Sequence, residues 1–199
     1  VDETDDADNT ADPFSIGTPL GVDTATLVTT AGSDVGEDDE GATTNVTLQI
    51  TGIGDGADSG LDTTDGTSIF LYDNNGVIEG RVGGETGDVA FALSVDNSGQ
   101  VTVAQYESLW HPTPGGSYDE PVDLAGKINA VVTVTDGDGD VATDNVAIGD
   151  YISFEDDGPT ASIDYVGGDV QATVDETDDA DNLIPDPFSI GTPLGVDTA

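Results

Sequence analysis

The chain has 199 residues and a formal net charge of −40, because 42 acidic residues face only two basic ones, Arg81 and Lys127. Nucleic-acid binding is excluded, since phosphate contacts need lysine and arginine, and direct membrane insertion is not expected. Without cysteine the chain has no disulfide and no thiolate metal site.

Short strands separated by turn signals are predicted in the first half of the chain. Residues 44–50 alternate apolar and polar side chains, which is the period of a half-buried strand. Asn-Gly at 75–76 and Asn-Ser-Gly at 97–99 are typical of hairpin turns. Only residues 105–110 are expected to form a helical turn. The strands predicted around the two hairpin turns are 68–72, 77–82, 89–95 and 100–105.

Two further strands, 128–135 and 141–152, flank a third turn that is acidic. Many short strands without a long helix favour an all-β fold, and we expect a Ca²⁺-stabilised β-sandwich of immunoglobulin-like or cadherin-like architecture. About 150 residues are enough to bury a core in such a sandwich.

The acidic turn reads Asp136-Gly137-Asp138-Gly139-Asp140 and is followed by Asp144. Alternating Asp and Gly lets the backbone turn tightly while the carboxylates converge, and clustered carboxylates suit Ca²⁺, which takes six to eight oxygen ligands. We expect several Ca²⁺ ions as cofactors; the alternative is a solvated turn without metal. The acidic stretches 37–40 and 55–65 are expected to be solvated loops. The predicted ligands at this hairpin tip are Asp136, Asp138, Asp140 and Asp144.

A second acidic motif, FEDDGP at residues 154–159, is typical of a linker that a metal stiffens. Residues 160–165 are expected to leave the linker, turn at 167–169 and return along 170–174, which brings the VDET motif of 174–177 back to the linker. The predicted ligands of this junction site are Glu155, Asp156, Asp157, Asp175 and Glu176.

The strand that follows the acidic turn ends at the linker. The hairpin tip is therefore expected at the opposite end of the sandwich from Asp156. The motif VDET also occurs at residues 1–4, so Asp2 and Glu3 are expected at the tip end, as metal ligands of a preceding junction.

The chain contains a long internal repeat. Residues 1–9 are identical to 174–182, and residues 12–25 are identical to 186–199. Such self-similarity is typical of tandem arrays. We expect residues 1–158 to form one repeat that lacks its first strand, and residues 159–199 to form the N-terminal part of the next repeat. No N-terminal signal peptide is visible, as expected for a piece of a longer protein.

The motifs VTVTDGDGDVATDNVAI (132–148), FEDDGPTA (154–161) and VDET resemble the extender repeats of RTX adhesins, large type I-secreted proteins of the LapA type. This resemblance implies tandem β-sandwiches with Ca²⁺ at their junctions, on the surface of a Gram-negative bacterium. It implies neighbouring repeats as partners, a spacer role in surface attachment and biofilm formation, and no catalysis.

Two alternatives stay open from the residues, a carbohydrate-binding module and a halophile protein. Tyr106, Trp110 and Tyr118 could stack on sugar rings in a carbohydrate-binding module, although Trp110 is expected to pack in the core. A halophile protein could be acidic for solubility, although 33 of the 42 acids are Asp, clustered at turns. An enzyme is not expected, because the chain has no GxSxG motif and its one histidine, His111, is expected to be a surface or packing residue.

Overall fold

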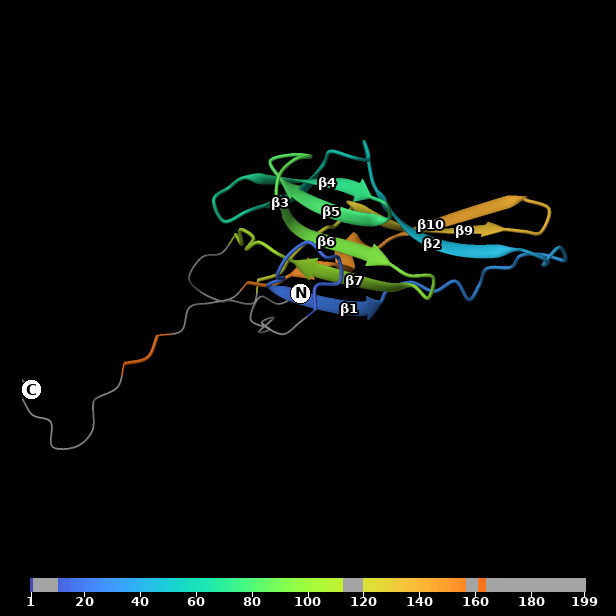
Figure 1. The fold of residues 1–199 in the computed structure, drawn as a ribbon, viewed down its shortest axis with the longest axis horizontal. Coiled ribbons are helices and arrows are strands. Elements are labelled where there is room, and N and C mark those ends of the chain that lie inside the picture. Colours follow the sequence, from blue (N-terminus) through green and yellow to red (C-terminus); the bar gives the residue numbers. More distant parts are fainter. Residues whose placement is uncertain (2–10, 113–119, 157–160, 164–199) are drawn as a thin grey trace, which may run out of the picture. The chain divides into compact units, whose positions relative to one another are not determined.

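The computed structural model describes residues 1, 11–112, 120–156 and 161–163 (Figure 1). These residues are almost entirely β-structure, and no α-helix occurs among them. The chain divides into two compact units, Val1–Pro159 and Thr160–Ala199, and all the strands named below belong to the first. The all-β sandwich expected from the sequence is confirmed.

The larger sheet is antiparallel and has the strand order β1-β7-β6-β5-β4-β3. Its Asn75-Gly76 turn has both residues at positive φ, 56° and 88°, as a two-residue hairpin requires. The strands are β1 (Gly21–Thr26), β3 (Ala57–Asp62), β4 (Ser68–Asn74), β5 (Val77–Val82), β6 (Val89–Val95) and β7 (Gln100–Gln105).

Facing it is a three-stranded antiparallel sheet with the order β10-β9-β2. Its strands are β2 (Thr43–Ile50), β9 (Ile128–Thr135) and β10 (Val141–Ala147). After β10 the chain forms a short 3₁₀ turn, Gly149–Tyr151, and then β11 (Ser153–Phe154), which pairs with β8 (Val122–Asp123). The three-stranded sheet therefore ends with β10, and the chain that follows pairs with β8 and no longer with β9.

The core lies between the two sheets and is filled by side chains that alternate along the strands. In β2, Val46, Leu48 and Ile50 are buried while the residues between them are exposed. Phe154 of β11 is fully buried against Phe91 of β6, with ring centroids 4.9 Å apart. The linker motif thus begins with an aromatic anchor in the core, which holds the end of the first unit in place.

Most predicted strands are confirmed, several with their exact bounds. Three differences have physical reasons. The predicted strand over 141–152 is interrupted, because the 3₁₀ turn breaks it after Ala147. Residues 105–110 form no helical turn. The stretch 55–65, expected to be a solvated loop, contains β3, whose Ser59 and Leu61 are buried. Its Asp-rich composition concealed an edge strand with one buried face.

Replacement of Phe154 by alanine is expected to lower the free energy of unfolding by about 3–5 kcal/mol, because it leaves a cavity against Phe91. Tyr151→Ala is the matched control three residues away. Its side chain is 73% exposed, so its loss should cost less than about 0.5 kcal/mol. Urea unfolding followed by circular dichroism measures both, and equal effects would contradict the anchor role.

Candidate metal centre

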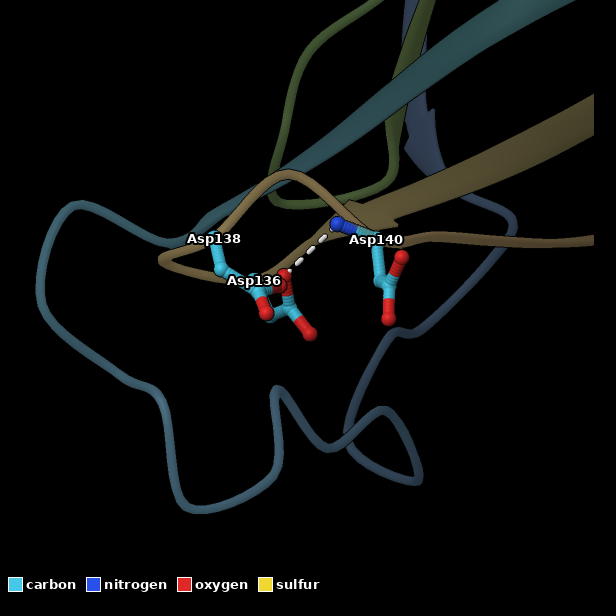
Figure 2. Close-up of side chains that lie close together, drawn as sticks. All are labelled: Asp136, Asp138 and Asp140. Atoms are coloured by element: carbon cyan, nitrogen blue, oxygen red, sulfur yellow. Dashed lines mark hydrogen bonds between the residues drawn. The ribbon is translucent and has the colours of Figure 1, made fainter.

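The turn between β9 and β10 brings three carboxylates together. One oxygen from each of Asp136, Asp138 and Asp140 lies within 4.8 Å of the others. Asp136 organises the turn: its Oδ1 accepts hydrogen bonds from the backbone N–H of Gly139 (3.0 Å) and Asp140 (2.8 Å). Figure 2 shows the three side chains on the same side of the turn. The turn therefore presents a preformed set of hard oxygen donors.

The loop between β1 and β2 packs against this turn. The N–H of Gly137 donates to the carbonyl oxygen of Asp38 (2.7 Å). A Cβ at position 137 would lie 2.6 Å from the carbonyl oxygen of Glu40 and 2.9 Å from that of Asp38, so only glycine fits this close approach. Two backbone carbonyls thus lie against Gly137, in the same turn that carries the three carboxylates, and mixed carboxylate and carbonyl oxygens are what Ca²⁺ prefers.

A hollow of about 160 Å³ adjoins the cluster, and Asp34 lines it together with Asp136 and Asp140. The acidic stretch 37–40 is an exposed loop, as expected, and this loop packs against the turn between β9 and β10. Sequence reasoning missed this contact because about a hundred residues separate the loop from the turn. The register of β2 on β9 explains this contact. It pairs Thr43 with Thr135 and so brings the loop before β2 to the turn after β9.

No basic side chain neutralises this cluster. Both cationic residues of the chain are engaged elsewhere: Arg81 bonds Glu79 (2.5 Å) and the carbonyl oxygen of Gly87 (3.0 Å), and Lys127 donates to the carbonyl oxygen of Asp58 (2.6 Å). Arg81 compensates Glu79, which is only 4% exposed. The carboxylates at the turn must therefore be screened by water and dissolved cations.

The pKa of Asp136 lies below its usual range. Hydrogen bonding with the Asp138 side chain is the main cause, and the backbone N–H groups of Asp140 and Gly139 add to it. A lowered pKa keeps this carboxylate charged well below neutral pH. The turn consequently offers negative charge to a cation over the whole physiological range.

The fourth predicted ligand, Asp144, does not join the cluster. It lies in β10 opposite Val132, and its Oδ1 accepts from the N–H of Asn145 (2.8 Å). Because β9 and β10 pair in continuous register, Asp144 lies within the paired strand and away from the turn. Among the residues that the structure describes, Asp136, Asp138 and Asp140 form the only group of three or more such side chains close enough to hold one ion together.

Of the predicted junction ligands, the structure describes Glu155 and Asp156; Asp157, Asp175 and Glu176 lie outside the described residues, as do Asp2 and Glu3. The N-terminal amine of Val1 donates to the carbonyl oxygen of Ser153 (2.8 Å), and the N–H of Glu155 donates to that of Val1 (2.9 Å). Figure 1 draws the turn between β9 and β10 far from the N mark. The tip and the linker are thus at opposite ends, as expected, but Val1 lies at the linker end and not at the tip.

Many other aspartates cap turns and do not face one another. Asp96 accepts from the N–H of Ser98 (2.8 Å) and of Gln100 (3.0 Å), and Asp73 accepts from the N–H of Gly76 (2.7 Å). Short aspartate side chains commonly bond the backbone in this way. The excess of Asp over Glu therefore has a source in turn chemistry that is independent of any metal.

The aromatic segment differs from the expectation. Trp110 is 50% exposed, and the neighbouring Leu109 takes the core position; the predicted packing of Trp110 in the core is wrong. Tyr106 is held by Asp12, and Tyr118 lies outside the described part of the chain. His111 is buried, with its Nδ1 2.7 Å from the carbonyl oxygen of Glu120. This places His111 in a packing role.

Comparison with protein families identifies the first three quarters of the chain. The model of a domain of unknown function, DUF5801, matches residues 1–149. The chain belongs to the DUF5801 family. No curated protein and no solved structure matches the chain significantly. The DUF5801 match spans the whole sandwich up to the 3₁₀ turn, including the acidic turn of the candidate site. In the described part of the chain, no helix is long and apolar enough to cross a membrane.

A separate acidic residue, Asp12, makes the protein sensitive to acid. Burial would raise its pKa, but the hydroxyl of Tyr106 (2.6 Å) and the N–H groups of Phe14 (2.9 Å), Gly17 (2.8 Å) and Ile16 donate to its carboxylate and lower the pKa to about 2. Burial and Asp12 in turn raise the pKa of Tyr106. Asp12 thereby ties the segment before β1 to the end of β7.

Because the pKa of Asp12 is lower in the folded chain than the usual value of about 3.9, its bonds stabilise the fold above pH 4. This stabilisation is lost as the pH falls from 4 toward 2. Tyr106→Phe should therefore be less stable than the wild type at pH 6, and the difference should shrink at pH 2. Comparing the two proteins cancels the titration of the other carboxylates. A difference that stays constant from pH 6 to pH 2 would contradict this assignment.

Proposed function

We propose that this chain is a structural spacer, a Ca²⁺-stabilised extender repeat of a bacterial cell-surface adhesin. The observation that carries the proposal is the group formed by Asp136, Asp138 and Asp140, in a turn whose Gly137 packs against the backbone carbonyls of Asp38 and Glu40, and without a basic residue to neutralise it. All the donors are oxygens, which favours Ca²⁺ over metals that prefer nitrogen or sulfur.

The ion would act by replacing repulsion with shared coordination. Without it, the turn and the loop between β1 and β2 carry like charges at close range, which destabilises the end of the sandwich. A bound Ca²⁺ would bridge β9–β10 to that loop and fix the two relative to one another. Three carboxylates and few further ligands are typical of the weaker extracellular Ca²⁺ sites, which fill at millimolar concentration.

The spacer role follows from the repeat. A chain that contains the same 23 residues at two positions is suited to a tandem array of similar domains, in which reach grows with the number of repeats. A rigid array projects a distal domain farther than a flexible chain of equal length. Secretion, the cell surface of a Gram-negative bacterium and neighbouring repeats as partners belong to this proposal.

The test is thermal unfolding in EDTA and in millimolar CaCl₂. The wild type should melt on the order of 5 °C higher with Ca²⁺, because an ion that binds only the folded state stabilises it by mass action. The double variant Asp138→Asn/Asp140→Asn should lose most of this increase. Asparagine keeps the size of the side chain and removes the charge, so the fold without Ca²⁺ should be retained or slightly stabilised.

The matched control is Asp73→Asn/Asp96→Asn, which removes two charges from two other hairpin turns. It should keep the full response to Ca²⁺. Magnesium and sodium chloride at equal ionic strength separate specific binding from screening. If the control loses the response as strongly as the turn variant, or if all divalent ions act alike, the ion is only screening charge and the proposed site is wrong. Small-angle scattering of the same samples tests whether Ca²⁺ extends the chain.

A further inference from the structure

The turn between β4 and β5 contains the one Asn-Gly pair of the sequence, Asn75-Gly76. Both residues are exposed, and both have the positive φ that a two-residue hairpin turn needs. Asparagine is a thermolabile residue type. It is most labile before glycine, because glycine has no side chain to shield its backbone nitrogen from the asparagine amide. The turn therefore joins structural necessity with chemical lability.

The reaction open to this pair is deamidation. The backbone nitrogen of Gly76 loses its proton and attacks the side-chain Cγ of Asn75. A bond from that nitrogen to Cγ forms while the bond from Cγ to Nδ2 breaks, and ammonia leaves with the proton. Water then opens the cyclic imide at either of its carbonyls and gives aspartate or isoaspartate. Nothing is oxidised or reduced, and water is the only co-reactant.

A carboxylate already accepts the hydrogen that this reaction must remove. The N–H of Gly76 donates to Oδ1 of Asp73 at 2.7 Å, which is short for a bond between an N–H and a carboxylate. The negative charge of Asp73 also opposes the negative charge that develops on the nitrogen as its proton leaves. This hydrogen bond is therefore expected to slow the attack.

The side chain under attack is fixed as well. Nδ2 of Asn75 donates to Oδ1 of Asn74 at 2.9 Å, and the backbone on either side of the turn is paired, Asn74 with Val77. Closure of the imide ring brings the Gly76 nitrogen to bonding distance from Cγ of Asn75, which requires rotation of the bonds that these contacts restrain. The turn must therefore open locally before it reacts.

The other aspartate turn repeats this arrangement. Asn97 is followed by Ser98, whose N–H donates to Oδ1 of Asp96 at 2.8 Å. In both hairpin turns, an aspartate before the asparagine thus accepts the N–H of the nitrogen that would attack it. Short aspartate side chains bond the backbone of turns in this way. At Asn97 the serine side chain adds steric hindrance, so Asn75 is the more reactive of the two.

Asn75 also ends a chain of hydrogen bonds that leads to a buried carboxylate. Nδ2 of Asn74 donates to Oε1 of Glu79 at 2.9 Å, and Glu79 is only 4% exposed and paired with Arg81. Deamidation replaces the Asn75 donor with a carboxylate, which repels Oδ1 of Asn74. Isoaspartate in addition lengthens the backbone of the turn by one carbon. Both products are therefore expected to weaken the hairpin where it contacts Glu79.

We propose that Asn75 is a site of spontaneous deamidation and that Asp73 slows the reaction by accepting the N–H of Gly76. The modification weakens the β4–β5 hairpin through Asn74 and Glu79. The proposal rests on the hydrogen bonds of one turn, and it depends neither on a metal nor on the spacer role.

The test is incubation of the whole chain at mildly alkaline pH, followed by proteolysis and by chromatography with mass spectrometry, which separate asparagine, aspartate and isoaspartate at residue 75. The folded wild type should react at about a tenth of its rate in urea or more slowly, and folded Asp73→Ala roughly tenfold faster than the folded wild type, since a hydrogen bond to a charged group is lost. Asp73→Asn keeps an acceptor without the charge and should lie between them. Circular dichroism checks that each variant is folded.

Asp55→Ala is the matched control. Oδ1 of Asp55 accepts the N–H of Asp73 at 2.8 Å, so this variant removes one carboxylate and one hydrogen bond beside the turn without changing the contact to Gly76. It should react at the wild-type rate. Equal acceleration in Asp55→Ala and Asp73→Ala would overturn the proposal, because it would show only a general loosening of the hairpin.

Two further outcomes contradict the proposal. If Asp73→Ala reacts no faster than the wild type, Asp73 does not slow the attack; a slower reaction would show that Asp73 acts as a base and assists it. Asn75→Asp, which is one of the two products, should melt at a lower temperature than the wild type. An unchanged melting temperature would overturn the link from Asn75 to Glu79.

Discussion

The chain cannot neutralise its carboxylates with its own basic residues. The repulsion between these carboxylates is the constraint on which the rest of the structure depends. Only two cationic side chains are available, and both serve the body of the sandwich: Arg81 compensates Glu79, and Lys127 bonds the backbone of β3. Most of the other acids in the described part of the chain lie on exposed turns and loops, where water reaches them. In the turn between β9 and β10 the backbone brings three carboxylates together.

This convergence has a local cause. In the hairpin turn at Asp96 and in the turn at Asp136, the first aspartate bonds the N–H groups that follow it. The turn at Asp96 continues with Asn97 and Ser98, whereas the turn at Asp136 continues with Asp138 and Asp140. The two turns share a scaffold and differ in charge. The backbone of such a turn needs only its first aspartate. The candidate site is therefore distinguished by the two additional carboxylates, Asp138 and Asp140.

Sequence patterns predicted this fold well because its signals are local. Alternation in β2 and the Asn75-Gly76 turn indicated strands and hairpins, and the triad Asp136, Asp138 and Asp140 was readable from its spacing. What was missed depends on contacts between distant segments. The carbonyls of Asp38 and Glu40 reach Gly137 of the turn only through the register of β2 on β9. Asp144 shares the motif but lies within β10, four residues beyond Asp140. Val1 lies beside Ser153, a pairing that no local pattern encodes.

The most direct test of the central claim is a titration of the folded protein with CaCl₂, observed residue by residue in amide NMR spectra. The account predicts saturable shifts of the amide signals of Gly137, Gly139 and Asp140, together with those of the loop at Asp38, while the signals of Ser98 and Gly99 in the other aspartate turn stay in place. Equal, non-saturating shifts at both turns would contradict it, because they would show that the cluster is screened by cations and does not bind one.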